Sequence, residues 1–372
     1  MKKGKNKPLQ KESAAAEKTN KKNRKKGKTI MLSILGIILI GVVFVGGTIG
    51  YFYISGRINP ALKAIYKMLP LPIVRIEDSS TITSDQLFQD AEAVRKFYES
   101  KDYAQRGERV DFSTREGETR LRMKERDILN KLIEDRIIKK IAETKGIKIS
   151  SQEIDKAVEE SLTASDSDYK KLALNLSSNY GWTIEQFKNK IVKNQLYLDR
   201  LFQWYKENLK NSNDYKRAEK ARASISESGD NFDDVVSIFS DGESAKQDGR
   251  IPWVEEDFII PEVADALSSM QEGQISGIIT SPLGMHIVVL EKRRESEDGN
   301  GTIKKEVQLK QVFIRGKSFI DWVQEQKKQM KVDVLLQEYQ WNVGTSEIEF
   351  SSSRLRELAK KIKIKSQGDP SL

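Results

Sequence analysis

The chain has 372 residues, enough for two or three domains, and 32% of them are charged. Its net charge of +9 comes from residues 1–28, which contain 12 Lys and Arg residues but only two Glu residues. We expect no nucleic-acid partner, because binding phosphates requires positive charge on the folded part. With no cysteine and a single histidine, disulfides, thiolate chemistry and a histidine-rich metal site are excluded, and we expect neither a metal nor a cofactor.

Residues 29–54 carry no charged side chain. About twenty apolar residues cross a bilayer as a helix, so this run predicts one transmembrane helix. A cleaved signal peptide is the alternative, but its apolar core would span only about 7–15 residues. The basic residues before the run place the N-terminus in the cytoplasm and the bulk of the chain outside the cell membrane.

The flanks of this helix suit a membrane anchor. Residues 1–28 form a basic cytoplasmic tail attracted to anionic head groups, so residues 1–54 are expected to contact membrane lipids. Tyr51, Phe52 and Tyr53 are typical of an interfacial aromatic belt. Residues 55–83 contain three prolines and are interpreted as a linker.

Residues 84–214 are predicted to be a helical domain. Apolar residues recur at three- and four-residue intervals between Arg120 and Lys145, and Gly146 follows where a helix would end. Ser150 with Glu153, and Thr183 with Gln186, have the spacing of capping boxes. A stripe of Phe187, Ile191, Leu198, Leu201 and Phe202 marks the last helix of this domain.

Two runs in this region, Leu132–Ser150 and Gly181–Lys188, resemble the N-terminal helical domain of SurA-type periplasmic chaperones. The resemblance implies a module that holds unfolded or newly translocated polypeptides. The alternative is that the apolar stripes only pack against one another, since surface left over after packing is needed to bind a client.

Residues 215–315 contain three runs in a fixed order: F-S-D-G-E-S-A-K at Phe239–Lys246, E-G-Q-I-S at Glu272–Ser276, and G-M-H-I-V-V-L at Gly284–Leu290. Together they resemble the parvulin (PpiC-type) peptidyl-prolyl isomerase domain. The resemblance implies a four-stranded antiparallel sheet covered by helices, and hence an α+β fold for the chain.

The first strand of the parvulin family has no counterpart before residue 215. Instead, an alternating run at Val307–Ile314 follows the last family strand and suits a central strand. We predict that the first strand has moved to the C-terminal side, a circular permutation in which His286–Leu290 and Val307–Ile314 pair as a hairpin.

The resemblance also implies the site. The family has two histidines and a cysteine or aspartate beside an apolar slot for the proline ring. Here only His286 matches; Gln311 takes the place of the other histidine, and Gly242 takes that of the acid, with Asp241 adjacent. The expected catalytic residues are thus His286, Gln311 and Asp241, and the expected substrate-binding residues are Ile251, Trp253, Ile259, Ile260 and Val263.

These assignments have structural alternatives. His286 is also consistent with a buried core histidine whose hydrogen bonds are satisfied. Asp241 is also consistent with a cap for the turn at Glu243–Lys246. Trp253 is also consistent with a residue that only packs. Val263 replaces a phenylalanine of the family, which predicts a slot with a truncated aromatic wall.

Residues 316–372 are expected to be a C-terminal helical segment and tail, in which Lys331–Leu336 is interpreted either as an edge strand or as part of the packing of the helical domain. The expected function is a membrane-anchored, extracytoplasmic folding factor with parvulin-type isomerase and chaperone activity. The alternatives are a holdase or scaffold that has lost catalysis, and a purely structural envelope protein.

Overall fold

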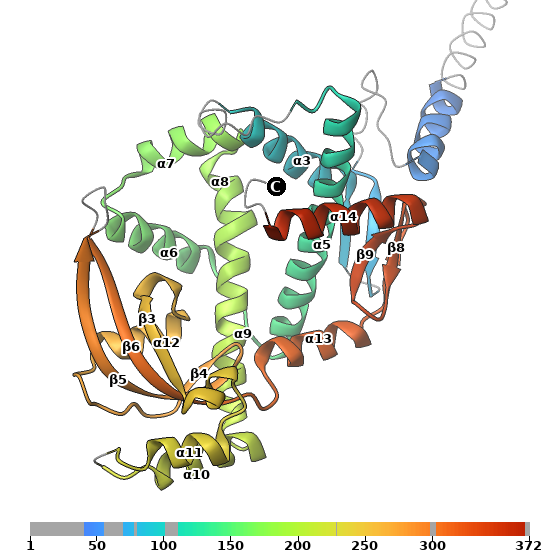
Figure 1. The fold of residues 1–372 in the computed structure, drawn as a ribbon. Helices are drawn as coiled ribbons and strands as arrows, with labels where there is room; N and C mark the ends of the chain where they lie inside the picture. The colour runs from blue at the N-terminus through green and yellow to red at the C-terminus, as the bar shows by residue number, and fades with distance from the viewer. Residues whose placement is uncertain are drawn as a thin grey trace, which may run out of the picture.

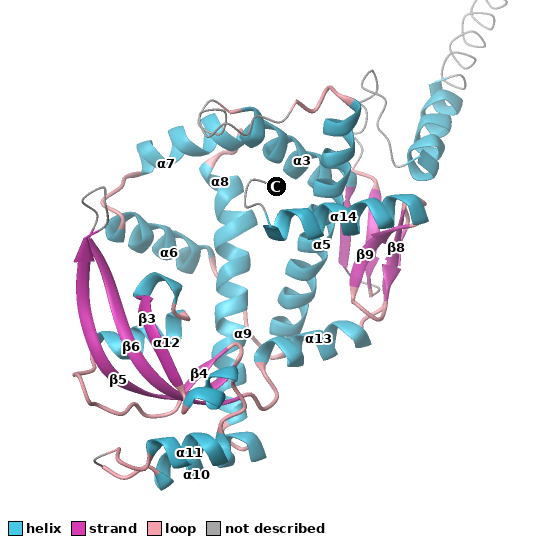
Figure 2. Ribbon diagram, viewed as in Figure 1, coloured by secondary structure: helices cyan, strands magenta, loops and turns pink. Residues whose placement is uncertain are grey.

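The computed structural model describes residues 41–55, 70–77, 80–100, 111–227, 229–297 and 303–368. Helices and strands are mixed, as Figure 2 shows, in agreement with the expected α+β class. Figure 1 shows a helical body, a four-stranded sheet with its own short helices, and an N-terminal helix, residues 41–55.

Helix 41–55 contains the described part of the predicted transmembrane segment, and residues 29–40 lie outside the described residues. No helix among the described residues combines the length and the apolar character needed to cross a membrane. Tyr51 is exposed, but Phe52 is fully buried, with its ring against that of Phe88. The predicted aromatic belt is therefore wrong for Phe52, which packs into the protein body.

The predicted linker, residues 55–83, contains two strands. β1 (Pro72–Ile76) pairs with β2 (Ser80–Thr83) on one side and with β7 (Val332–Val334) on the other. Ile73, Val74, Ile76 and Ile82 are fully buried. Burial of these β-branched side chains stabilises strands that would be too short to form alone.

The helical body contains α3 (Ser84–Glu99), α5 (Arg115–Thr144), α6 (Ser151–Ala164), α7 (Tyr169–Asn175), α8 (Ile184–Phe187) and α9 (Lys193–Leu209). Both predicted capping boxes are present, and Gly146 has the left-handed φ of +80°. The predicted stripe is buried at Leu201 and Phe202, whereas Ile191 remains 45% exposed.

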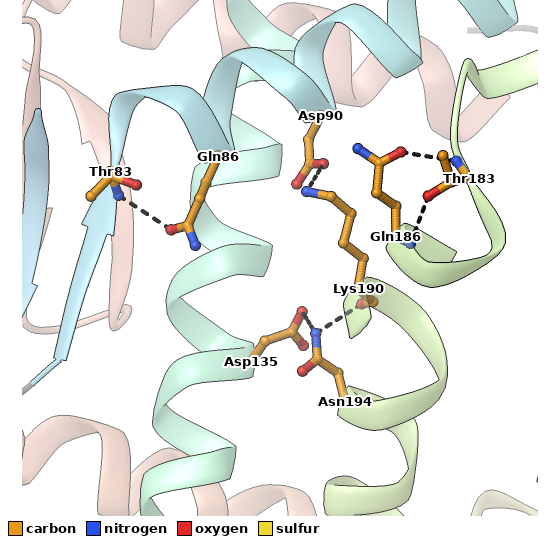
Figure 3. Close-up of polar contacts among 8 residues, drawn as sticks. All are labelled: Thr83, Gln86, Asp90, Asp135, Thr183, Gln186, Lys190 and Asn194. Atoms are coloured by element: carbon orange, nitrogen blue, oxygen red, sulfur yellow. Dashed lines mark hydrogen bonds and ion pairs between the residues drawn. The ribbon is translucent and has the colours of Figure 1, made fainter. Parts of the chain in front are cut away.

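A polar network joins three of these helices, as Figure 3 shows. Lys190 lies in a π-helical turn before α9, and its Nζ binds Asp90 of α3 at 2.6 Å. Asn194 of α9 donates to Asp135 of α5 at 2.9 Å and to the carbonyl oxygen of Lys190 at 2.8 Å. The wider π turn leaves backbone carbonyls that such side chains satisfy, so the network fixes α9 against α3 and α5.

Residues after the sheet complete the helical body. α13 (Phe319–Gln329), β8 (Tyr339–Asn342), β9 (Glu347–Phe350) and α14 (Ser353–Gly368) lie beside α5 and β1 in Figure 1. The ring of Phe319 packs against those of Phe202 and Tyr205 of α9 in tilted arrangements. The C-terminal segment thus holds three strands besides its helices, of which β7 falls within the predicted Lys331–Leu336.

Asn130 of α5 ties the β8–β9 hairpin to the body through the backbone of Ile348, whose N–H and carbonyl bind its side chain at 2.6 and 3.3 Å. Asn130→Ala is expected to cost about 1–2 kcal/mol, because it leaves both backbone groups without that partner. Urea unfolding measures this loss. Asn189→Ala, which removes an exposed side chain bonded only within its own helix turn, is the control and should change stability by less than about 0.5 kcal/mol.

The second sheet has the strand order β3 (Arg250–Glu255), β6 (Ile303–Ile314), β5 (Gly284–Glu297), β4 (Ile279–Ser281). β5 and β6 form one long antiparallel hairpin in which His286 lies opposite Phe313. The predicted pairing of these two segments is confirmed. α10 (Asn213–Ser224), α11 (Phe232–Phe239) and α12 (Pro261–Ser268) complete this part of the chain. α11 packs on one face of this sheet and α12 on the other.

Candidate active site

A cavity of about 370 Å³ opens on the β3–β6–β5–β4 sheet. β6 contributes Leu309, Gln311 and Phe313, which alternate along the strand and therefore face the same side. The remaining lining comes from the loop and short turn before β3, from β3 itself, from α12 and the segment leading into it, from the β4–β5 turn and the start of β5, and from the residue that follows β6. These residues are Asp241, Gly242, Glu243, Ile251, Val254, Phe258, Ile259, Ile260, Val263, Leu283, His286 and Arg315.

One wall of the cavity is aliphatic. Ile251, Ile259, Ile260 and Val263 all line it, where they were expected. Val263 is buried on α12 in a small core with Leu267 and Leu309, and the three isoleucines pack on that core. This wall is fixed by packing before any ligand binds, as a slot for an apolar ring requires.

Trp253 does not line the cavity, although it was expected to bind substrate. A register shift between Ile251 and Val254 interrupts the pairing of β3 with β6, and Pro252, which has no N–H to donate, lies within it. The bulge brings Val254 to the cavity side instead. Trp253 stacks under the guanidinium of Arg294, 4.1 Å from the ring centre, and so has the packing role given as its alternative.

Aromatic rings are present in the cavity at positions that the sequence did not indicate. Phe313 lies on β6 beside His286, with 4.9 Å between ring centres. Phe258 lies at the mouth and is 78% exposed, and Leu283 on the β4–β5 turn is 46% exposed. The prediction of a truncated aromatic wall therefore holds for position 263 but not for the cavity as a whole.

His286 lies at the start of β5 and is 3% exposed. Its Nδ1 lies 3.3 Å from Oε1 of Gln311, and its Nε2 lies 2.8 Å from Oγ of Ser281. With this amide orientation Nδ1–H donates to Gln311 and the Ser281 hydroxyl donates to Nε2. Burial lowers the pKa of His286, and the bond to Gln311 offsets this only in part, so the ring is neutral near pH 7.

The hydrogen bonds continue beyond Gln311, whose Nε2 donates to Oγ of Ser244 at 3.3 Å. Ser281, His286, Gln311 and Ser244 thus form one chain of uncharged groups, which we call the neutral relay. Ser281 and Ser244 were not identified from the sequence. Across the part of the chain that the structure describes, no group of three or more His, Cys, Asp or Glu side chains could hold a metal ion.

Gly242 leaves a space that Phe313 partly fills. A Cβ at this position would lie 3.3 Å from Cβ of Phe313 and 3.6 Å from Oγ of Ser244. The backbone φ of −81° suits any residue. A side chain at position 242 would therefore fit after a small shift and would point toward the neutral relay.

Asp241 lines the cavity without contacting His286. Its two carboxylate oxygens bind the Arg217 guanidinium at 2.8 Å each, and Oδ2 also accepts the Arg315 N–H at 3.0 Å. The bond to Arg217 holds the pKa of Asp241 below its usual value, so the carboxylate stays ionised. Asp241 forms no capping bond to the turn at Glu243–Gln247, and the alternative of a cap is wrong.

The comparisons with known proteins agree with this geometry. The family model for the PpiC-type PPIase (rotamase) domain matches residues 201–292. Among curated proteins, the chain is similar to the chaperone SurA of Alkalilimnicola ehrlichii, with 30% identity over 111 residues, 29% of this chain and 25% of the relative. SurA of Bordetella avium is 29% identical over 104 residues, 27% and 20% of the two chains. SurA of Nitrosospira multiformis is 37% identical over 82 residues, 22% and 18%.

These similarities are partial. The aligned part spans a quarter or less of the length of these SurA relatives. The family match ends before β6, the strand that carries Gln311 and Phe313. β6 nevertheless lies between β3 and β5 in the sheet, as the permuted arrangement requires. The chain therefore contains a PpiC-type peptidyl-prolyl isomerase domain, matched at residues 201–292, and is related at modest identity to SurA chaperones.

Proposed function

We propose that this chain is a folding factor that binds proline-containing segments of unfolded polypeptides and accelerates their cis–trans isomerisation. The observation that carries the proposal is the cavity, in which an aliphatic wall faces the neutral relay. The aliphatic wall suits a prolyl ring, and the relay lies where a polar set is needed beside it.

Prolyl isomerisation requires only rotation about one bond. Rotation about an X-Pro bond crosses a barrier of roughly 18–20 kcal/mol, and no covalent bond needs to form. A catalyst must bind the twisted amide better than the planar one. Fixed hydrogen-bonding groups such as the Gln311 amide, held in place by Ser244, stabilise the changed charge distribution of the twisted amide without reorganising.

A holdase without catalysis is the second candidate, and Gly242 favours it. This position offers no side chain to the reacting bond, and both ring nitrogens of His286 already have protein partners. Under this alternative the cavity binds proline segments but does not distinguish the twisted amide from the planar one.

We further propose that the chain is anchored in the cell membrane by one helix within residues 29–54, with the folded part outside the cytoplasm. The uncharged run and the basic residues before it support this orientation. Helix 41–55 exposes Val42, Val43 and Phe44, which suits a lipid environment. Loss of the chain from the membrane fraction after alkaline carbonate washing would contradict the anchor.

A protease-coupled assay on proline peptides tests the activity of the detergent-solubilised full chain. A rate above the uncatalysed background supports the isomerase, and background rates leave the holdase. Suppression of client aggregation tests the holdase separately, because it requires binding alone. A chain that neither isomerises nor prevents aggregation would contradict both candidates.

The double substitution Gly242→Asp with Gln311→His is expected to raise kcat/KM about tenfold. It returns to the site the side chains that the parvulin family carries there, and a titratable group near the reacting bond contributes more than a neutral amide. The same assay measures the change. Gly242→Ala is the matched control because it fills the space without adding a polar group, and a gain of equal size in this variant would contradict the explanation.

A further inference from the structure

The cavity has a charged end that the isomerisation itself does not require. Leu309, Gln311 and Phe313 line the cavity in that order along β6, and Arg315 lines it one residue past the end of the strand. Because alternate residues share a face, the lining changes from apolar through amide and aromatic to cationic. At about 3.3 Å per residue, Arg315 lies about 13 Å along the chain from Gln311.

Arg315 supplies the unbalanced charge at this end. The other charged groups facing it are already paired: Asp241 with Arg217 at 2.8 Å, and Glu243 with Lys246 at 2.7 Å. Arg315 gives its backbone N–H to Asp241, but its exposed guanidinium forms no hydrogen bond or ion pair with any residue that the structure describes. Among these five groups, Arg315 is therefore the charge without a hydrogen-bonded counter-charge. Asp214, which does not line the cavity, acts on Arg217 together with Asp241.

Building on the isomerase or holdase role proposed above, we propose that Arg315 selects client segments with a carboxylate close to the prolyl bond. Together with the hydrogen bond from Arg217, the Arg315 charge lowers the pKa of Asp241. The Arg315 guanidinium nevertheless forms no hydrogen bond with a described residue, and so it offers a fork of donors that matches a carboxylate. With the proline on the aliphatic wall and the client extended, the distance along β6 and the reach of the arginine side chain place the Asp or Glu about two to four residues from the proline.

Peptide binding to the full chain in detergent tests this selection. Each fluorescent peptide carries one proline and one Glu, moved from one to six positions away on either side, and matched peptides carry Gln or Lys at the same position. We expect Glu to bind about fivefold more tightly than Lys at two to four positions on one side of the proline, the range for an exposed ion pair, and to have little effect elsewhere.

Variants of the protein then test whether the preference for Glu depends on Arg315. Arg315→Ala should remove the preference, and Arg315→Glu should reverse it toward Lys. Arg250→Ala is the matched control: Arg250 is exposed and neighbours Ile251, so it projects from the opposite face of β3. It removes the same net charge, and the preference should survive.

Each other outcome has a distinct meaning. Equal affinity for Glu, Gln and Lys at every position, or a preference that survives Arg315→Ala, overturns the role of Arg315 and leaves the proline slot standing. A Glu effect of equal size at all positions reflects net charge and also overturns it. Equal binding after the proline is replaced by alanine overturns the proposed function itself.

Discussion

His286→Ala is expected to lower kcat/KM for prolyl isomerisation about 100-fold, the loss typical when one member of a preorganised polar set is removed. The ring separates Ser281 from Gln311 and packs against Phe313. Without it, Gln311 loses one of its two side-chain partners and water enters beside the reacting bond. The protease-coupled assay measures the rate.

A control for folding is needed because His286 is buried. The substitution leaves Gln311 and Ser281 each short of a hydrogen bond, at a cost of about 1–3 kcal/mol per group, so thermal unfolding is measured in parallel. Ser281→Ala removes only the partner of Nε2 and keeps the ring, and we expect a smaller loss of rate. If a folded His286→Ala variant retains activity within twofold of the wild type, the relay has no catalytic role and the cavity acts by binding alone.

Features that depend only on residues close together in the sequence were predictable. The capping boxes at Ser150 and Thr183 lie within three residues of their partners, and Gly146 marks the end of α5 by its own conformational freedom. The hairpin between β5 and β6 followed from its alternating pattern combined with the sheet order of the parvulin family. The position of His286 in the cavity followed from matching the run Gly284–Leu290 to the family.

Long-range partners were not predictable. Asp241 is fixed by Arg217 on α10, and no local pattern links the two. The strands β1 and β7 hold five and three residues, and they pair Val74 with Val334 although the whole isomerase domain lies between these residues in the sequence. Strands so short carry almost no periodic signal and form because the body buries them.

Trp253 is an intermediate case, because a signal was present in the sequence. Proline within a strand marks an edge or a bulge, and a bulge reverses which residues face the cavity. The family resemblance assigned Trp253 to substrate binding, whereas the register shift at Pro252 puts Val254 on the cavity side. Phe258 and Phe313 then supply the aromatic surface that alignment to the family assigned to position 263.

Glu125→Gln is expected to stabilise the chain at pH 8 by up to about 3 kcal/mol and to have little effect at pH 5. Glu125 lies on α5 near the phenol of Tyr339 on β8. Burial raises the pKa of Glu125 to about 7, although Arg122 opposes the rise. Tyr339 is buried as well, and its pKa is raised by burial first and by the Glu125 charge second.

The direction follows from the protons bound in each state. At a pH well below about 4.5 the carboxyl is protonated in both the folded and the unfolded chain, and stability is unaffected. As pH rises from there to about 7, the unfolded chain loses its proton freely, whereas the folded chain must ionise a half-buried, desolvated carboxyl group. Stability therefore falls through this window and stays lower above it. A rise from 4.5 to about 7, which already includes the opposing effect of Arg122, corresponds to about 3 kcal/mol at 1.36 kcal/mol per pH unit. This is an upper value because the side chain is only partly buried.

Urea unfolding of the wild type and Glu125→Gln at pH 5, 6, 7 and 8 measures the window. Glu118→Gln is the control, since Glu118 is exposed on the same helix and its removal should leave the pH dependence unchanged. Wild-type stability that stays flat between pH 5 and 8 would contradict the buried charge. Because Arg122 also binds Glu338 and Asn130 holds Ile348, the substitution acts at the contact through which α5 positions the β8–β9 hairpin. That contact is made of charged and polar groups, so its strength depends on pH in a way that the apolar packing of α13 on α9 does not.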